Sequence, residues 1–186
     1  MNYIPIHPLH TPRLLLRRLT IGDAPEYFSR LGGSEAVTRY MLFRPHKSLS
    51  ESLSSIEKAL RRYETGEFYR WGIELPGSGL IGVIDLLAFD REKESCSFAY
   101  MLAEEFWDRG YGTEALKAVL DFAFREMELK SVQADHFAEN TASGAVMRKA
   151  GMIFQGTSPG KYEKDGIVHD APRYLITREM WEARQR

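Results

Sequence analysis

Two closely spaced glycines stand at the start of a predicted helix, in the run FWDRGYGTEAL from Phe106 to Leu116. Glycine lets the backbone approach a ligand closely, and the first amides of a helix have no partners inside it. The helix dipole adds partial positive charge at the same end, and Arg109 adds a full charge beside Gly110 and Gly112. This pattern predicts a site for a phosphate or pyrophosphate, with a tight turn before a helix as the simpler alternative.

Two nucleotide-binding patterns can be compared with this loop. A Walker loop needs a lysine after its last glycine, whereas Gly112 is followed by threonine and glutamate, so that pattern is excluded. A dinucleotide fingerprint fits better, because Gly110, Gly112 and Ala115 satisfy GxGxxA and Asp135 follows 20 residues later. The preceding strand, however, is expected to end at Leu102, well before the first glycine. An NAD-dependent enzyme is therefore an alternative prediction.

The hydrophobic patterns that must position this loop predict a sheet with both antiparallel and parallel pairing. Short polar connections between the central strands favour hairpins, and a long helix then leads to a strand that should run parallel to its predecessor. The predicted strands are Arg13 to Thr20, Tyr69 to Leu75, Leu80 to Phe89, Ser95 to Leu102, Val132 to His136, Met152 to Gly156 and Ile167 to Thr177. The predicted helices are Ala24 to Leu31, Ser50 to Gly66, Tyr111 to Met127 and Thr141 to Ala150. The fold class is α/β (α+β), with a mixed, largely antiparallel sheet of about seven strands flanked by helices.

Composition limits the partners and the compartment. The chain has 186 residues, which we interpret as a single domain over residues 1–186. A formal net charge of -1, from 25 basic and 26 acidic residues, argues against nucleic acid or an anionic membrane as a partner. Cys96 is the one cysteine, so no internal disulfide forms, and we expect it to be buried in a cytoplasmic protein. No apolar run is long enough to predict a membrane span.

The loop and the region after it resemble the GNAT acyltransferase superfamily, in particular its ribosomal-protein N-terminal acetyltransferase (RimJ/RimL-like) branch. The resemblance rests on YMLAEEFWDRGYGTEA from Tyr100 to Ala115 and ENTASGAVMRKAGM from Glu139 to Met152. The runs TPRLLLR from Thr11 to Arg17 and LIGV from Leu80 to Val83 also fit, as does a Lys-Asp-Gly turn near the end. The superfamily usually has glutamine or arginine where this chain has Trp107, a departure that the RimJ/RimL-like branch commonly shares.

The resemblance implies that acetyl-coenzyme A (acetyl-CoA) binds at this loop as the cosubstrate. The backbone of the strand before the loop would carry the pantetheine arm, because an extended amide chain can pair with a strand edge. The pyrophosphate positions that it implies are Arg109, Gly110, Tyr111, Gly112 and Thr113, and the pantetheine positions are Tyr100, Met101 and Leu102.

The resemblance also assigns roles to an AsnxxSer motif, which here is Asn140 and Ser143. Ser143 would serve the leaving thiolate, and Asn140 would contribute to cofactor binding. Asn140 is also a good N-cap for the helix that follows, and the two roles are compatible. Ser143 as an ordinary serine of the first helical turn is the alternative.

The general base is the least determined group. Relatives often carry an acid in the strand before the loop, where this chain has Ser97. Asp85 is an alternative base, because it alternates with apolar residues of its strand, where burial would raise the pKa of its carboxyl group. An ion pair with a basic neighbour would explain the same position. His136, or His169 with Asp170, would relay a proton or be purely structural, and a water chain without a dedicated base also remains open.

The remaining candidates are less specific. Trp71, Tyr100, Phe106 and Trp107 would frame an acceptor pocket or belong to the core. No histidine, cysteine or carboxylate cluster has the spacing of metal ligands, so no metal is predicted.

The sequence thus predicts an N-acetyltransferase that moves an acetyl group from acetyl-CoA to a primary amine by direct attack in a ternary complex. The acceptor would be a protein N-terminus or a small molecule. A non-catalytic sensor of acyl-CoA is the alternative from another functional class. The resemblance alone suggests a homodimer.

Overall fold

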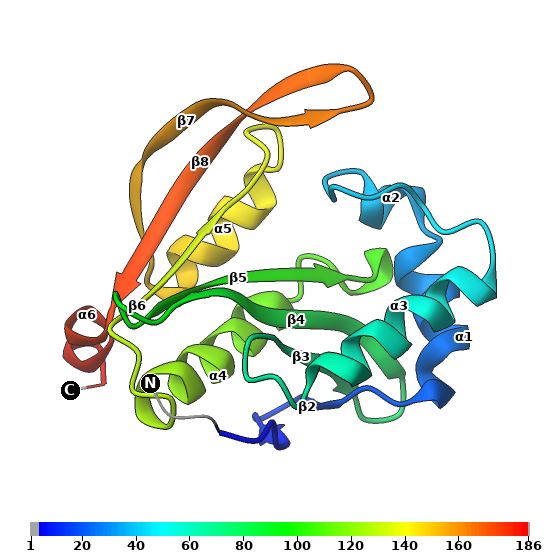
Figure 1. Ribbon diagram of the computed structural model, residues 1–186, viewed down its shortest axis with the longest axis horizontal. Coiled ribbons are helices and arrows are strands. Elements are labelled where there is room, and N and C mark those ends of the chain that lie inside the picture. Colours follow the sequence, from blue (N-terminus) through cyan, green and yellow to red (C-terminus); the bar gives the residue numbers. More distant parts are fainter. Residues whose placement is uncertain (1–3, 186) are drawn as a thin grey trace.

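The computed structural model describes residues 4–185, which form one mixed sheet of eight strands in the order β1-β2-β3-β4-β5-β6-β8-β7 (Figure 1). All neighbouring strands are antiparallel except β5 and β6, which are parallel as predicted. The strands are β1 (Leu9–His10), β2 (Leu15–Arg18), β3 (Tyr69–Leu75), β4 (Gly79–Asp90), β5 (Ser95–Leu102), β6 (Ser131–Asp135), β7 (Ile153–Lys164) and β8 (Ile167–Thr177).

The sequence prediction missed one strand and misjudged the length of two. β1 has only two residues, too few to show an alternating pattern. β2 is shorter than predicted, whereas β7 continues to Lys164, well past the predicted end at Gly156. Register shifts interrupt the pairing of β7 with β8, and β7 contains Pro159 and Gly160 in this part. The alternating hydrophobic pattern is therefore lost there, although the two strands remain paired.

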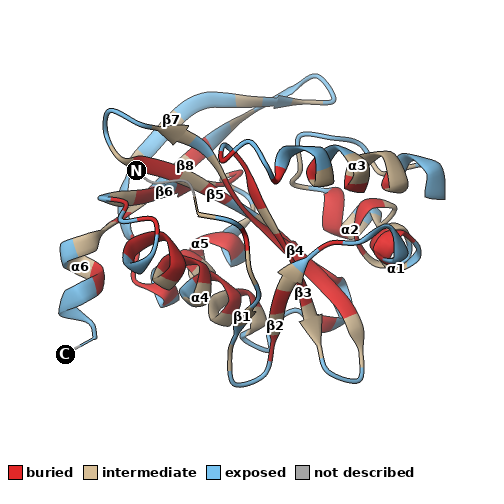
Figure 2. Ribbon diagram, turned by 60° about the horizontal axis from the view of Figure 1, so that its bottom comes forward, coloured by how far each residue is buried: buried red, intermediate tan, exposed pale blue. Residues whose placement is uncertain are grey.

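Helices cover both faces of the sheet, with α4 and α5 on one side and α1 and α3 on the other (Figure 2). The helices are α1 (Ala24–Glu26), α2 (Glu35–Thr38), α3 (Leu49–Arg62), α4 (Tyr111–Arg125), α5 (Thr141–Ala150) and α6 (Arg178–Ala183). The bounds of α5 are those predicted: the Asn140 side chain caps its start, and Gly151 ends it with a φ of 102°. The first predicted helix is α1 continued by a wider turn over Tyr27–Gly32.

The core lies where α4 packs on the centre of the sheet. Buried residues concentrate in β3, β4 and α4 (Figure 2). Phe122 of α4 meets Trp71 of β3 edge to face at 5.2 Å between ring centroids, and both are almost completely buried. Burial of a side chain of this size stabilises the fold by about 2 kcal/mol. This packing fixes α4, and hence the loop before it, against the sheet.

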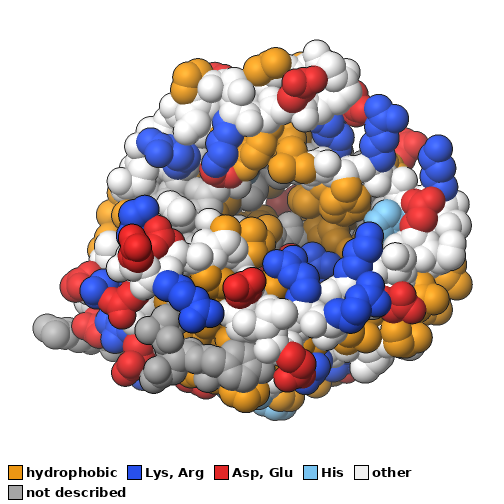
Figure 3. Space-filling model, in the orientation of Figure 1, with side chains coloured by type: hydrophobic (Ala, Val, Ile, Leu, Met, Phe, Trp, Pro, Cys, Tyr) orange, Lys and Arg blue, Asp and Glu red, His pale blue; other side chains and the backbone are white. Residues whose placement is uncertain are grey.

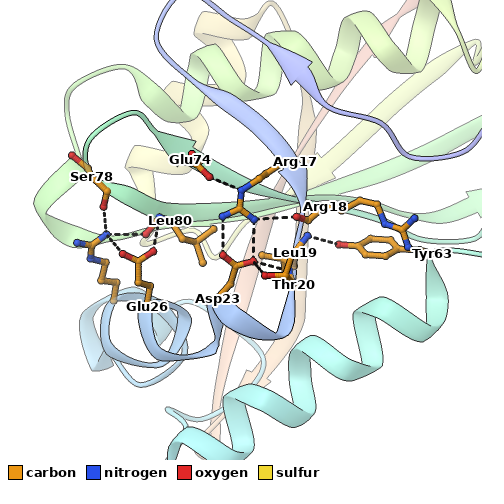
Figure 4. A network of polar contacts seen from close by, with 11 residues as sticks. Arg17, Arg18, Leu19, Thr20, Asp23, Glu26, Tyr63, Glu74, Ser78 and Leu80 are labelled. Atoms are coloured by element: carbon orange, nitrogen blue, oxygen red, sulfur yellow. Dashed lines mark hydrogen bonds and ion pairs between the residues drawn. The ribbon is translucent and has the colours of Figure 1, made fainter.

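The segment after β2 is tied to β3 and β4 by a polar network (Figure 4). Arg17 donates to both carboxylate oxygens of Asp23, at 2.7 and 3.0 Å, and to Glu74 of β3. Farther along, Glu26 accepts from the Leu80 amide at 2.7 Å, and Arg30 donates to the carbonyls of Ser78 and Leu80. These bonds hold the irregular α1 region on the sheet.

The loop before α4 is braced by the N-terminal segment. The guanidinium group of Arg13 lies on the Glu114 carboxylate at 2.6 Å, donates to the Arg109 carbonyl and stacks over the Tyr111 ring at 4.4 Å. The Thr11 hydroxyl donates to Glu114 at 2.6 Å. Burial alone would raise the pKa of Glu114, but the hydrogen bonds from Thr11 and Arg13 outweigh it and hold the pKa below its usual value.

Asp85 is bound in an ion pair inside the sheet. It lies directly opposite Arg70 in the register of β3 and β4, and the two side chains form paired hydrogen bonds of 2.8 and 2.7 Å. Asp85 is 6% exposed. The Tyr27 hydroxyl lies near the same arginine. The carboxylate therefore balances a buried charge, which was the alternative to its predicted role as a base.

Replacing Asp85 should lower the free energy of unfolding of the protein. Asp85→Asn leaves the Arg70 guanidinium group buried without a counter-charge, which should cost about 3 kcal/mol in the free energy of unfolding. Urea denaturation measures this loss. Asp90→Asn, on the same strand but exposed to solvent, should change stability little. Equal effects of the two substitutions would contradict the structural role of Asp85.

The brace at Glu114 should depend on pH. The pKa of the Glu114 carboxyl group is lower in the folded state than in the unfolded state. The stability that this carboxylate contributes is therefore fully present above the unfolded-state pKa of about 4.3, and it is lost as the pH falls through the folded-state pKa. Glu114→Gln should thus lose about 2 kcal/mol at pH 7, and the difference from the parent should shrink below about pH 4. Urea denaturation across this pH range, with exposed Glu182→Gln as control, measures it. A difference that stays constant with pH would contradict the account.

Candidate functional site

A cavity of about 570 Å³ opens where β5 and β6 separate. The two strands pair only from Ser95 to Ser97 on β5, opposite Ser131 to Gln133 on β6. Beyond this point the edge of β5 from Phe98 to Leu102 has no strand beside it on that side in the described part of the chain. Space-filling shows a hollow at the centre of this face, with hydrophobic side chains around it (Figure 3). Backbone groups of β5 are therefore available to an extended ligand.

Most residues predicted from the sequence line this cavity. They come from β5, the start of α4 and the start of α5, three elements far apart along the chain. The predicted residues that line it are Tyr100, Met101, Leu102, Gly110, Tyr111, Gly112, Thr113, Asn140 and Ser143. Arg109 and Asp85 are not among the lining residues.

The glycine loop has the geometry that the sequence suggested. Gly110 has a φ of 81°, a left-handed conformation that favours glycine, and α4 starts at the next residue. No side chain caps this end of α4 in the described structure, so the first amides face the cavity without a competing acceptor. A Cβ atom on Gly112 would lie 3.3 Å from the Tyr100 ring, so this glycine also lets the strand and the helix approach closely.

Tyr100 and Ser143 meet beside the helix start. Burial raises the pKa of the Tyr100 hydroxyl, and the nearby Ser143 hydroxyl partly opposes that rise. Ser143 is 7% exposed, and its amide is bound to Asn140. The sequence predicted for Tyr100 a backbone contact with the cofactor, or a place in an aromatic pocket or the core. It did not predict this hydroxyl pair, because residues on a strand and on a later helix show no fixed spacing.

The carbonyl of Leu102 is already occupied. The indole nitrogen of Trp107 donates to it at 2.7 Å, which folds the loop back onto the end of β5. Trp107 thus has a structural function at the position where the wider superfamily has a polar residue. Of the aromatic candidates, Phe106 and Trp107 line the cavity, whereas Trp71 belongs to the core.

Apart from Arg109, the sequence analysis named no basic residue near the loop as a ligand. Lys149 on α5 is exposed and lines both this cavity and a second hollow. That second hollow runs along α4 and also includes Arg13, Lys117 and Arg125. The acids Glu114, Asp121 and Glu126 line the same hollow, so the charge of its basic residues is largely balanced.

At its other end the cavity is aromatic. Phe137 stacks on Tyr162 of β7 with ring centroids 4.7 Å apart, and Tyr40 lies 6.0 Å from Phe137. Asp135, at the end of β6, accepts hydrogen bonds from Tyr162 and Lys161. The aspartate that fits the dinucleotide fingerprint is thus engaged by β7.

The histidines predicted as proton relays are both bonded to protein groups. His136 lines the cavity, with Nδ1 at 2.7 Å from the Phe137 carbonyl, while Nε2 is buried without a hydrogen-bond partner among the described residues. His169 contacts Glu139 at 3.0 Å. Asp170 accepts from the Gly160 amide in the β7–β8 hairpin. Cys96 is fully buried, and burial raises the pKa of its thiol, which is unfavourable for a nucleophile.

Residues 4–185 also bear on two other classes of function, metal binding and membrane spanning. No group of three or more histidine, cysteine, aspartate or glutamate side chains is placed to hold a metal ion. No helix in this range has the length and apolar character needed to cross a bilayer.

Comparisons with known proteins agree with this geometry. Residues 13–153 match the model of a family described as acetyltransferase (GNAT) domain. The chain is 29% identical over 171 residues to an uncharacterized N-acetyltransferase, YoaA, of Bacillus subtilis, covering 91% of this chain and 96% of YoaA. It is 30% identical over 111 residues to a putative ribosomal N-acetyltransferase, YdaF, of the same organism, covering 60% of each.

A solved structure shows the same fold. The ribosomal L7/L12 α-N-protein acetyltransferase RimL, in complex with coenzyme A, superposes with a TM-score of 0.83 at 19% identity, covering 92% of this chain and 98% of that one. The family match, not this likeness of fold, determines the assignment, and it gives no support to an NAD-dependent enzyme or to a sensor. The chain belongs to the GNAT family of N-acetyltransferases, which take their acetyl group from acetyl-CoA.

Proposed function

We propose that this protein acetylates a primary amine by direct attack on acetyl-CoA, with both substrates bound in the cavity between β5 and β6. The observation that carries the proposal is the open edge of β5, from Phe98 to Leu102, beside the uncapped start of α4. An amide arm needs such a strand edge, and a pyrophosphate needs such a helix start. One domain over the whole chain would supply both.

The cofactor is proposed to lie along these two features. The amides from Gly110 to Thr113 would hold the pyrophosphate, with Lys149 adding positive charge. The backbone of Phe98 to Met101 would bind the pantetheine arm. The Leu102 carbonyl is already bound by Trp107, which limits its part in that pairing. Acetyl-CoA supplies the thioester, and its carbonyl carbon would then lie near Ser143.

The proposed catalytic role of the protein's own residues is to protonate the leaving group, which is the thiolate of coenzyme A. The amine nitrogen forms a bond to the acetyl carbon, the carbon–sulfur bond breaks, and the proton lost by nitrogen balances the one gained by sulfur. Ser143 would donate a proton to the thiolate, and Tyr100, whose hydroxyl lies near that of Ser143, would replace it. We assign no base role to Asp85, because Arg70 occupies its carboxylate.

A homodimer and a cytoplasmic location stay predictions. β7 lies at one edge of the sheet and exposes Ile153 and Phe154, each about half exposed, which is compatible with a partner at that edge. The resemblance remains the ground for the dimer.

Ser143→Ala tests the proposed chemistry. Loss of the proton donor should lower kcat about 100-fold while the Kd of acetyl-CoA, measured by calorimetry, stays within about twofold. Coenzyme A release in the presence of an amine panel measures turnover. Ser54→Ala, on α3 and outside the cavity, should leave both values unchanged. Binding of acetyl-CoA with no acetylated amine in any assay would contradict the proposal and favour a sensor.

A further inference from the structure

The acceptor end of the cavity has an apolar and aromatic wall. Val37, Met41 and Leu42, from α2 and the segment after it, line one side. The stacked rings of Phe137 and Tyr162 line the other, at an interplanar angle of 21°. Aromatic walls of this kind favour a flat or aliphatic group over a strongly hydrated chain.

The carboxylates at this end are already engaged. Asp135 is bound by Tyr162 and by the ammonium group of Lys161. Glu139 contacts His169 at 3.0 Å, and this hydrogen bond holds the pKa of Glu139 below its usual value. The third carboxylate of the cavity, Asp108, belongs to the loop before α4, at the cofactor end. A polycationic acceptor would therefore find no carboxylate without a hydrogen-bonded protein partner among the residues that line the acceptor end.

Two further cations lie near the acceptor end. The guanidinium group of Arg39 lies 5.3 Å from the Tyr40 ring. The ammonium group of Lys164 lies close to the same segment, where it donates to the carbonyls of Thr38 and Met41, both at 2.7 Å. Nearby positive charge disfavours a second ammonium group and favours the neutral form of an amine, which is the form that attacks.

The same contacts form a bridge over the acceptor end. Besides its bonds to Thr38 and Met41, Lys164 donates to the Arg39 carbonyl at 3.0 Å, and its neighbour Asp165 pairs with Arg44 at 2.9 Å. In Figure 1 the tip of the β7–β8 hairpin extends across to α2. We define this bridge as the four-residue contact of Lys164, Asp165, Arg39 and Arg44. A bulky acceptor, such as the terminus of a folded protein, would have to pass beneath it.

We propose that the acceptor is a small primary amine that carries one apolar, aromatic-sized group and no second positive charge. The inference rests on the proposed acetyl transfer and names its substrate class. The ring or alkyl group packs against the wall formed by Tyr40, Phe137 and Tyr162, and the amino group points along the cavity toward the thioester at Ser143. Polyamines are excluded by charge, and folded protein termini by the bridge.

Competing acceptors test the class. Phenethylamine, spermidine and a ten-residue peptide with an N-terminal serine are each assayed for coenzyme A release, with products identified by mass spectrometry. We expect kcat/KM for phenethylamine to exceed both others by about tenfold or more, the discrimination expected of an apolar pocket. Preference for spermidine or the peptide would overturn the inference and leave the proposed acetyl transfer intact. Acetyl-CoA binding with no product from any acceptor would overturn both.

Two substitutions test the physical basis, and they should act in opposite directions. Tyr40→Ala removes part of the aromatic wall and should raise KM for phenethylamine about tenfold, with the Kd of acetyl-CoA unchanged by calorimetry. Tyr40 is half-buried on a loop, so the fold should tolerate its loss. Phe154→Ala, which removes an exposed ring outside the cavity, is the matched control.

Lys161→Met exposes the charge of Asp135 and should raise kcat/KM for spermidine about fivefold, while phenethylamine changes little. The inference is overturned if Tyr40→Ala acts no more strongly than Phe154→Ala, or if Lys161→Met leaves the ratio of the two acceptors unchanged.

Discussion

The early separation of β5 from β6 is the constraint on which the site depends. The strands share only three paired positions before they diverge. Main-chain groups of β5 that would otherwise join the next strand are left at an open edge, where unpaired polar groups are costly unless solvent or a ligand meets them. The fold tolerates this opening because β4 pairs along the other edge of β5 and α4 packs beneath the sheet. The proposed substrate site thus lies at a break in the sheet, where β5 and β6 cease to pair.

The start of α4 combines with this edge because two other interactions fix the loop between them. Trp107 binds the end of β5 from one side, and Arg13 with Glu114 holds the loop from the N-terminal segment. Gly112 removes the side chain that would keep the helix away from Tyr100. The result is a continuous path from an anion-binding helix end to a strand edge and then to the hydroxyl groups of Tyr100 and Ser143.

Many of the helices and strands could be predicted from the sequence, because residues within each element determine it. Turn residues and hydrophobic periods gave β3, β5 and α5 their bounds, because the side chains that decide these elements lie within them. The glycine loop and Ser143, which line the cavity, belong to motifs whose spacing is local; their roles stay predictions. The two-residue β1 and the extension of β7 were missed, since pairing with a neighbouring strand, and not their own pattern, sustains them.

Contacts between side chains that are distant in the sequence could not be predicted from local patterns. Asp85 was assigned a catalytic role because its position in a hydrophobic strand looked unusual, but the register of β3 places Arg70 directly opposite. The stacking of Phe137 on Tyr162 and the bridge at Lys164 both join segments distant in sequence, and no spacing rule connects them. Register and long-range packing, rather than composition, determine these contacts.

A crystal structure of the protein soaked with acetyl-CoA tests the central claim most directly. The account predicts pyrophosphate oxygens within about 3 Å of the amide nitrogens from Gly110 to Thr113, and an amide arm paired with the edge of β5 after Ser97. A well-ordered cofactor bound elsewhere, with the cavity between β5 and β6 empty, would contradict it.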